Sequence, residues 1–481
     1  MVEVAKNQTP SDSNNVRWES SADTMTEQPL NEPVLGYSPG SPERNSIIQE
    51  IDRQMSETIE IPCIINGEEV YTGHTIPQVI PHNHGHVLAN VHLAGREEME
   101  SACSAAVNAQ RSWIEMGLEE RCKIFEKCAD LLAGDWRMRV NVSTMLNQSK
   151  TVFQAEIDSA CELIDFWRFN CHYARGFHDD FQPLVSPEGV VNSTDIRPLE
   201  GFVLSITPFN FTSIAANLPS APAIVGCTSV WKPSRNSYYS NYYLMRLMME
   251  AGLPPGVINF LPGSGAEITE VALSNPNFAG LHFTGSTATF QGLWQEIGLA
   301  LPKLNSYPRI VGETGGKDFI VAHPDCDRRG LVVALLRGAF EYQGQKCSAA
   351  SRAYIPRSVW NEISGELADE IGKIAMGDAR DFTNFMTAVI DKRAFDKISG
   401  YIQRASERDS CQVFCGGGYD DSLGYFIEPT IILTEDPNSE SMIEEIFGPV
   451  LTVYLYDDDE FDAILKVCDE ASPYALSLIH I

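Results

Sequence analysis

An alternation of apolar strands and helical segments between residues 201 and 300 constrains the fold of this chain more than any other feature. The runs GFVLSITPFN (201–210), TSVWKPS (228–234), VINFLPG (257–263) and AGLHFTGS (279–286) alternate with helical segments such as YYSNYYLMRLMMEAG and TATFQGLWQEIG. Strands that alternate with helices of this length form parallel sheets with helical crossovers. The sequence therefore predicts an α/β fold with a Rossmann-like sheet.

A second α/β pattern follows residue 312. It consists of DFIVAH (318–323), a helix around GLVVALLRGAFEY, the strand SRAYIP (351–356) and a helix near 358–374. Before the first sheet, residues 96–175 carry apolar residues three and four apart, which is typical of amphipathic helices. Residues 183–200 are bounded by prolines and predict a strand or hairpin arm outside this core. We therefore expect a first domain over 46–312 and a second over 313–475.

Residues 1–45 are rich in Ser, Asn, Asp, Pro and Gln, and we expect them to be disordered or extended. The first 28 residues hold Lys6 and Arg17 against five acidic residues. An organellar leader would be rich in arginine and poor in acids. No targeting signal is therefore predicted from this segment.

The net charge and the spacing of the cysteines argue against several classes of protein and site. The formal net charge of −30 argues against nucleic acid and anionic membrane surfaces, because both require clustered Lys and Arg. No apolar run approaches the roughly 18 residues of a membrane span. The 12 cysteines show no C-x-x-C pair and no zinc-like spacing, so we expect free thiols in a reducing compartment and no metal site.

Several polar residues follow the predicted strands, where ligands bind in open parallel sheets. Lys232 ends a strand before Pro233 and could bind ribose hydroxyls or a phosphate, or be a solvated surface lysine. Asn210 could stabilise an oxyanion with its amide, or only form a turn. Ser286 opens a helix whose free N–H groups favour a pyrophosphate, although such turns are common. The usual G-x-G-x-x-G fingerprint is incomplete, because GSGAEI ends at Ile268.

Two further residues could perform covalent and acid–base chemistry. Glu313 lies in the glycine-rich GETGGK, where a carboxylate could act as a general base or merely cap a turn. Cys347 lies in YQGQKCSA between a lysine and a serine. Most free cysteines are small buried hydrophobes, whereas a nucleophile needs an electropositive, partly open setting.

Taken together, TPFN, WKPS, FTGS, GETGGK, GQKCSA and EEIFGPV resemble the NAD(P)-dependent aldehyde dehydrogenase superfamily in order and spacing, over roughly residues 30–475. The resemblance implies a Rossmann-like NAD-binding domain and an α/β catalytic domain. It assigns Cys347 as the nucleophile, Asn210 to the oxyanion hole and Glu313 as the base that activates water. NAD contacts are implied for Thr207, Lys232, Gly285, Ser286, Thr287, Ala288, Thr289, Glu445 and Phe447.

NEPVLGYSPGSPERNSI, KTVFQAEIDSACELIDFWRFN and GAFEYQGQKCSAASRAYIP are similar to one branch of this superfamily. That branch oxidises L-glutamate γ-semialdehyde, in equilibrium with 1-pyrroline-5-carboxylate, to L-glutamate in the second step of proline catabolism. The resemblance implies a thioester on the cysteine, a substrate contact from Ser348 and a homo-oligomer, with a dimer expected for the full-length protein and the arm at 183–200 serving oligomerisation. It also implies the mitochondrial matrix, with the cytoplasm as the alternative.

The chain departs from the family pattern at its end. The family's catalytic domain continues beyond SPYAL, so we expect the second domain to be C-terminally truncated. The hexapeptide LSLIHI (476–481) resembles a translated sequencing adapter, and we expect it to be non-native.

Three other functions compete with this one. The chain could oxidise a different aldehyde, or be an inactive homologue with a structural or binding role, since fold alone does not fix function. The presence of Cys347, Glu313, Asn210 and Lys232 argues against a purely structural role. A thiol-dependent hydrolase would need a histidine partner for its cysteine, and no motif supplies one.

Overall fold

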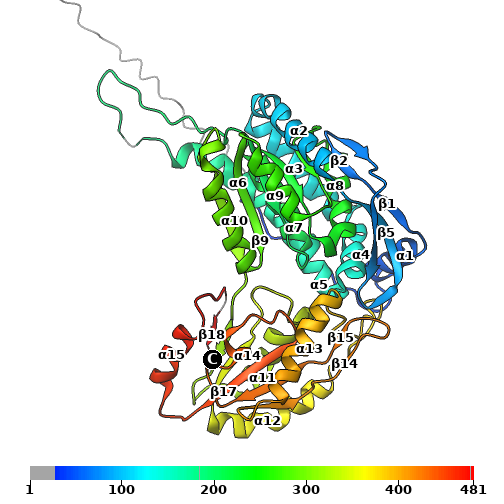
Figure 1. Ribbon diagram of the computed structural model, residues 1–481, viewed down its shortest axis with the longest axis vertical. Coiled ribbons are helices and arrows are strands. Elements are labelled where there is room, and N and C mark those ends of the chain that lie inside the picture. Colours follow the sequence, from blue (N-terminus) through cyan, green and yellow to red (C-terminus); the bar gives the residue numbers. More distant parts are fainter. Residues whose placement is uncertain (1–27, 184, 477, 481) are drawn as a thin grey trace, which may run out of the picture.

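The computed structural model describes residues 28–183, 185–476 and 478–480, and these form two lobes (Figure 1). The first 27 residues of the expected N-terminal segment, and residues 477 and 481 of the expected non-native tail, lie outside the described part. Within that part, no helix is long and apolar enough to cross a membrane. The predicted α/β fold is confirmed, since each lobe is built around a largely parallel sheet.

The first lobe contains a seven-stranded sheet of order β10-β9-β6-β7-β8-β2-β3. The four predicted strands are present and parallel to one another, and β10 extends the parallel set. Strands β6, β7 and β8 are buried on both faces, which explains why their sequences are continuously apolar. The strands are β2 Cys63–Ile65, β3 Glu68–Val70, β6 Phe202–Ile206, β7 Thr228–Lys232, β8 Ile258–Phe260, β9 Phe278–Gly285 and β10 Arg309–Thr314.

Helices cover both faces of this sheet. Tryptophan, cysteine and aliphatic side chains from α3, α4, α6 and α8 form the largest apolar core. Most of these helices follow the apolar spacing seen in the sequence. The helices are α1 Pro42–Met55, α2 Arg96–Glu115, α3 Leu118–Ala133, α4 Arg137–Gln148, α5 Val152–Ala155, the π-helix η2 Glu156–Cys161, α6 Glu162–Asp180, α7 Thr212–Ile224, the 3₁₀ turn η3 Arg235–Ser237, α8 Tyr238–Ala251, α9 Gly265–Ser274, α10 Thr287–Ala300 and the 3₁₀ turn η4 Leu301–Lys303.

The second lobe contains a six-stranded sheet of order β13-β16-β17-β12-β11-β18, in which only β13 is antiparallel to its neighbour. The predicted strands at 318–323 and 351–356 appear as β11 and β12. The strands are β11 Phe319–Val321, β12 Arg352–Pro356, β13 Cys411–Cys415, β16 Thr430–Thr434, β17 Val450–Tyr456 and β18 Leu478–His480. The helices are α11 Arg328–Phe340, the 3₁₀ turn η5 Glu341–Gly344, α12 Arg357–Gly372, α13 Lys392–Ser406, α14 Glu440–Ile443 and α15 Phe461–Glu470.

Two small sheets complete the structure. One has the order β1-β5-β4 and the other pairs β14 with β15. Their strands are β1 Ile59–Ile61, β4 Thr75–Ile80, β5 Asn83–His92, β14 Tyr419–Asp420 and β15 Phe426–Ile427. Residues 28–41, which precede α1, contain no helix or strand. They are nevertheless fixed to the first lobe, because Tyr37 donates to Glu156 at 2.7 Å and Glu32 pairs with Arg137 at 2.6 Å.

The segment expected to be a strand or hairpin arm extends away from the first lobe as a long loop (Figure 1). Among its described residues, 183 and 185–200, there is no strand, so the strand prediction was wrong. Side chains replace the expected ladder. Asn192 bonds to Ser186 and Val185, and the backbone N–H of Thr194 donates to Gln182 at 3.0 Å. An arm is therefore present, with side-chain rather than backbone pairing.

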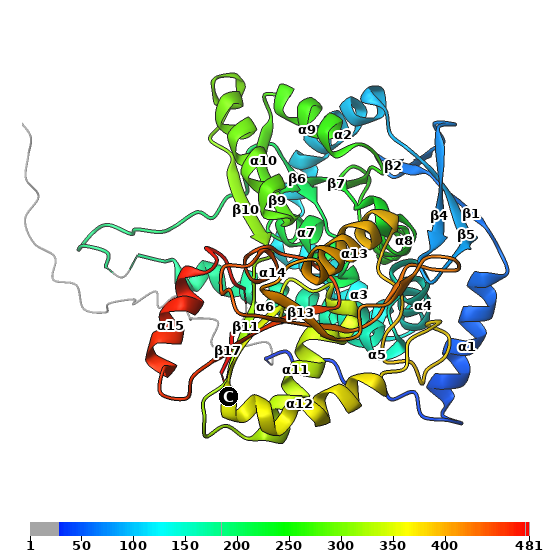
Figure 2. The same cartoon turned by 60° about the horizontal axis from the view of Figure 1, so that its bottom comes forward.

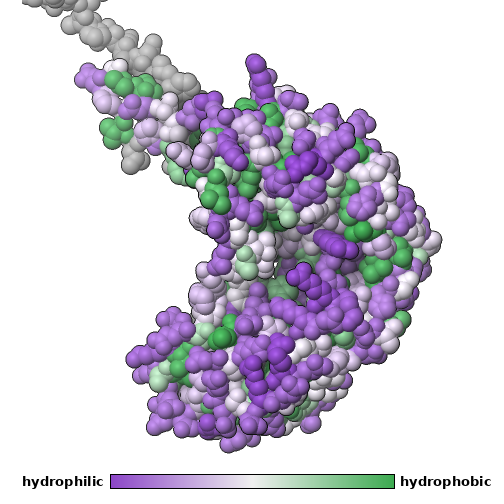
Figure 3. All heavy atoms as spheres, viewed as in Figure 1, coloured by the Kyte–Doolittle hydropathy of each residue, from purple (hydrophilic) through white to green (hydrophobic). Residues whose placement is uncertain are grey.

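The two lobes leave a hollow between them, visible on the left of Figure 3. Figures 1 and 2 both place α13 where the lobes meet, and Asn236 of η3 donates to Asp391, the N-cap of α13, at 2.7 Å. The chain crosses between the lobes at 315–318, from the end of β10 to the start of β11. Residues near 313 therefore lie at the junction.

Candidate active site

The loop that carries Cys347 follows α11 and has an unusual backbone. Tyr342 and Gln343 have φ angles of 49° and 56°, a left-handed conformation that costs free energy in non-glycine residues. Long-range contacts hold it. The Gln343 amide donates to the carbonyl of Ala388 at 2.8 Å, and the Tyr342 hydroxyl donates to the carbonyl of Gln148 at 3.0 Å. Both lobes therefore fix the position of Cys347.

Cys347 faces Glu313 across the lobe junction. Its Sγ lies 3.5 Å from Oε1 of Glu313, with the thiol donating to the carboxylate. Burial raises the pKa of Cys347 to about 12, and the neighbouring Glu313 carboxylate adds to the rise. The resting residue is thus a thiol whose nearest proton acceptor is Glu313. Glu313 lies on strand β10 rather than on the turn that the glycines suggested, and the turn begins after Thr314.

Asn210 contacts the same loop. It lies between β6 and α7 with 4% of its surface exposed. Its Nδ2 donates to the backbone carbonyl of Gln345, two residues before Cys347, at 2.9 Å. An amide NH₂ has two donors, so the second can serve an oxygen bound near the thiol.

Thr207 and Lys232 lie at the carboxyl ends of adjacent parallel strands, where Ile206 pairs with Lys232. The hydroxyl of Thr207 accepts a hydrogen bond from the Trp231 indole at 3.0 Å. Burial lowers the pKa of Lys232 to about 8. A Cβ on Gly265 would lie 3.8 Å from Nζ of Lys232, so this ammonium lies beside the first turn of α9. A partly buried ammonium in that position can bind oxygen atoms of a ligand.

The first turn of α10 lies at the end of the neighbouring strand β9. Gly285 ends the strand, and Ser286 is the N-cap whose Oγ accepts from the N–H of Thr289 at 3.3 Å. Thr287 and Ala288 occupy the first two helical positions, where backbone N–H groups lack helical acceptors. The helix dipole also favours negative charge there.

Glu445 and Phe447 reach the junction from the second lobe, between α14 and β17. The Glu445 carboxylate lies against the backbone of Gly315, where an added Cβ would lie 1.8 Å from Oε1, so a side chain at 315 would displace this carboxylate. Burial raises the pKa of Glu445. Phe447, at φ 58°, packs edge-on against Phe209 of the TPFN segment with ring centroids 5.8 Å apart. These contacts bring GETGGK, TPFN and EEIFGPV together.

Ser348 follows the thiol and is exposed, so its hydroxyl is available to a ligand. The sequence assigned no role to three charged residues near Cys347, namely Lys150, Asp158 and Lys346. Lys150 has 0% exposure, and Asp158 lies in the π-helix η2.

A serine–histidine–aspartate arrangement that does not include the thiol also occurs in the structure. Nδ1 of His82 lies 2.8 Å from the hydroxyl of Ser149, and Nε2 lies 3.3 Å from Asp378. Ser149 is fully buried at 0% exposure, so no substrate reaches its hydroxyl. This arrangement does not support hydrolase chemistry.

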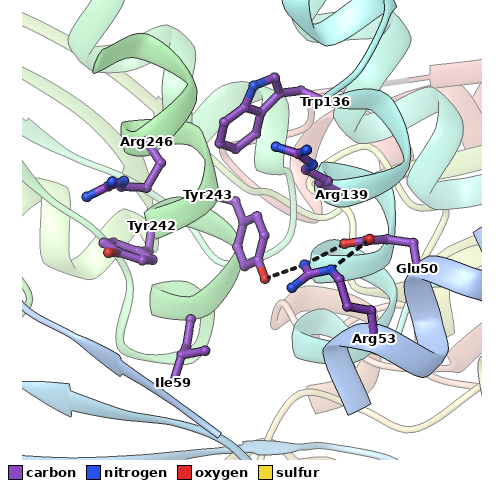
Figure 4. A pocket seen from close by; sticks show the side chains of 8 residues that line it. All are labelled: Glu50, Arg53, Ile59, Trp136, Arg139, Tyr242, Tyr243 and Arg246. Carbon is purple, nitrogen blue, oxygen red and sulfur yellow. Dashed lines mark hydrogen bonds and ion pairs between the residues drawn. The ribbon is translucent and has the colours of Figure 1, made fainter. Parts of the chain in front are cut away.

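A hollow of about 440 Å³ lies on the outer side of the first lobe, between α1, α4 and α8 (Figure 4). Arg53, Arg139 and Arg246 line it. Arg53 pairs with Glu50 at 2.7 Å, and Arg246 forms an ion pair outside the hollow. No residue implied in catalysis or NAD binding lines this hollow, so we treat it as separate from the candidate active site.

Comparison with known proteins supplies the family. The model of the aldehyde dehydrogenase family matches residues 70–478. Delta-1-pyrroline-5-carboxylate dehydrogenase of Agaricus bisporus is 47% identical over 449 residues, which cover 93% of this chain and 82% of the relative. The human mitochondrial enzyme of the same name is 42% identical, covering 96% and 81%.

Comparison with solved structures leads to the same group of enzymes. The delta-pyrroline-5-carboxylate dehydrogenase of Mycobacterium tuberculosis bound with NAD superposes with a TM-score of 0.90 at 46% identity, covering 99% of this chain and 84% of that one. The match extends over both lobes. This chain therefore belongs to the aldehyde dehydrogenase family, among the delta-1-pyrroline-5-carboxylate dehydrogenases.

Proposed function

We propose that this chain oxidises L-glutamate γ-semialdehyde, the open form of 1-pyrroline-5-carboxylate, to L-glutamate with NAD as the hydride acceptor. The contact that carries this proposal is the one between the Cys347 thiol and the Glu313 carboxylate at 3.5 Å, beside the Asn210 amide. The names of the relatives and the NAD bound to a similar structure support the substrate and the cofactor. The reaction is the second step of proline catabolism.

The residues at the lobe junction fit a dinucleotide. Lys232 has no ion-pair partner among the described residues, and its ammonium can bind ribose hydroxyls. The first turn of α10 offers N–H groups to a pyrophosphate. Glu445 can accept hydrogen bonds from the second ribose, and the Phe447 ring can lie beside the nicotinamide.

The chemistry follows from the positions of three residues. Cys347 loses its proton to solvent, and its sulfur then attacks the aldehyde carbon. The Asn210 amide and the backbone N–H of Cys347 donate to the resulting oxyanion. NAD, when bound, accepts the hydride from this adduct, which leaves a thioester on Cys347. Glu313 then takes a proton from water, and the hydroxide releases the acid and restores the thiol.

Ser348 is the proposed contact for the carboxylate of the substrate, because its exposed hydroxyl follows the thiol directly. An aldehyde of different specificity is the alternative substrate. NADH release with pyrroline-5-carboxylate and with a panel of aliphatic aldehydes separates the two through kcat/KM. A higher kcat/KM for an uncharged aldehyde would contradict the proposed substrate.

The charge of Lys232 predicts a pH dependence of NAD binding. Its lowered pKa, about 8, means that the ammonium is present below that pH and is lost as the pH rises through it. We expect the Kd for NAD to rise several-fold between pH 7 and pH 9.5, measured by titration calorimetry. Lys232→Met should bind weakly and remove this dependence. A Kd that stays constant in the wild type would contradict a role for the charge.

We also propose that two copies of this chain associate through the arm. Val185, Val190 and Val191 are 73%, 52% and 84% exposed, which is unusual for three valines on one loop. We expect Val191→Asp to reduce the mass measured by light scattering, while Val333→Asp, at an exposed valine on α11, leaves it unchanged. An unchanged mass for both variants would contradict the arm as the interface.

Relatives from Dictyostelium discoideum and Homo sapiens are named mitochondrial. On that basis we propose that this protein acts in the mitochondrial matrix. Fluorescent tagging at the C-terminus of the protein expressed from its own gene tests the location, and a diffuse cytoplasmic signal would contradict it.

A further inference from the structure

Two lysines share one carboxylate beside the candidate active site. Nζ of Lys150 lies 2.6 Å from Oδ2 of Asp158, and Nζ of Lys346 lies 3.3 Å from the same oxygen. Lys150 is 0% exposed and Asp158 is 3% exposed. Lys346 also lies 3.8 Å from Glu341. The three residues Lys150, Asp158 and Lys346, called the charge network below, link the segment after α4, the π-helix η2 and the loop of Cys347.

The charge network touches aromatic residues on both sides of the site. Nζ of Lys150 lies 4.4 Å from the ring centre of Phe211 and 4.3 Å from that of Tyr342. Ammonium groups are attracted to aromatic faces at such distances, most strongly when they are desolvated. Phe211 directly follows Asn210, and Tyr342 belongs to the strained part of the Cys347 loop. One buried ammonium therefore contacts both the oxyanion side and the nucleophile side.

Asp158 pairs with both lysines, so its negative charge offsets theirs. Two ammonium groups cannot be held close together in a buried place without an anion, because desolvation and mutual repulsion both act against them. Burial lowers the pKa of Lys150 to about 8, and the neighbouring Lys346 contributes to the lowering while Asp158 opposes it. Asp158 therefore holds the ammonium group of Lys346, the residue before the nucleophile, against η2.

The backbone that supplies Asp158 is itself unusual. Residues Glu156–Cys161 form a π-helix between α5 and α6, a geometry that occurs mostly as short insertions, frequently at functional sites. Asp158 is two residues into this turn and faces Lys150, whereas Glu156 hydrogen bonds to Asn141 at 2.7 Å on the opposite side. The π-turn thus presents one carboxylate to the candidate active site.

We propose that Asp158 is a positioning residue of the aldehyde dehydrogenase reaction. Through Lys346 it fixes the Cys347 sulfur against Glu313, and through Lys150 and Phe211 it fixes the Asn210 amide. It acts on the step in which sulfur attacks the aldehyde. The proposal rests on the proposed function for its kinetic test, and a second test needs no aldehyde.

The kinetic test is a double-mutant cycle on Asp158 and Lys346, followed by single-turnover NADH formation at saturating NAD. We expect Asp158→Asn and Lys346→Met each to slow this step at least 10-fold, and the double variant to be no slower than the worse single variant. Lys346→Arg, which keeps the ion pair, should stay within about threefold of wild type. The Kd for NAD should change less than about twofold. Asp369→Asn, at an exposed aspartate on α12, is the matched control and should behave as wild type.

The second test is alkylation of Cys347 by iodoacetamide at pH 7.5, mapped by mass spectrometry. Glu313 contributes to the raised pKa of the thiol. Loss of the Cys347–Glu313 contact in Asp158→Asn should therefore lower that pKa and speed alkylation of Cys347 at least threefold. A variant that is merely unstable would expose several of the buried cysteines together. The expected result is faster alkylation at Cys347 alone.

Additive losses in the cycle, or a Lys346→Met variant as fast as wild type, would overturn the proposal. Equal acceleration at buried cysteines such as Cys128 and Cys171 would assign Asp158 to stability instead. If Asp158→Asn does not fold, the Lys346→Met and Lys346→Arg pair decides the question by the same two measurements. If the wild type releases no NADH with any aldehyde, the proposed function fails, while the alkylation test still judges the positioning of Cys347.

Discussion

We expect Cys347→Ala to lose aldehyde oxidation by roughly four orders of magnitude or more, while NAD binding changes less than about twofold. The reason is that different residues form the covalent bond and bind NAD. The sulfur forms and releases the covalent bond, whereas the proposed NAD contacts come from Lys232, the first turn of α10 and Glu445. Stopped-flow NADH absorbance measures the first quantity, and titration calorimetry measures the second.

A matched control is Cys415→Ala, because Cys415 is also partly exposed but lies on β13 in the second lobe. Its activity should equal that of the wild type. NADH formation by Cys347→Ala at a normal rate would remove the covalent mechanism. Loss of NAD affinity together with activity would mean that the alanine disturbs the strained loop around Tyr342 and Gln343.

Glu313→Gln is expected to separate the two halves of the reaction. The amide cannot take a proton from water, so thioester hydrolysis should slow by about 10²-fold or more. The substitution also removes a negative charge 3.5 Å from the sulfur, which lowers the pKa of Cys347, although burial still holds it above its ordinary value. A pre-steady-state burst of about one NADH per site should therefore survive, followed by a slow steady state.

Rapid-mixing absorbance records the burst, and iodoacetamide alkylation of Cys347 at pH 7.5 should be faster in Glu313→Gln than in wild type. The control is Glu366→Gln at an exposed glutamate of α12, which should show neither effect. Loss of the burst and of the steady rate in equal proportion would place Glu313 in the first step. Alkylation that does not accelerate would contradict the contact with the thiol.

Local sequence patterns determined much of the first lobe. The apolar runs at 202–206, 228–232 and 278–285 are strands because residues buried on both faces must be apolar, and this is visible without any partner. The position of Lys232 at a strand end followed from the proline after it. The pairing of Cys347, Glu313 and Asn210 followed from a resemblance to a family rather than from spacing, since these residues lie 34 and more positions apart.

Tertiary structure alone decided the remaining features, because they depend on contacts between distant segments. The arm at 183–200 lacks a ladder because its polar side chains take the backbone bonds, which no periodicity reveals. The fully buried Lys150 was invisible in the sequence, since its charge is acceptable only with Asp158 and two aromatic rings around it. The raised pKa of Cys347 likewise arises from burial and from Glu313 on another lobe. A sequence records residue types and periods, whereas burial and electrostatic partners exist only once the chain has folded.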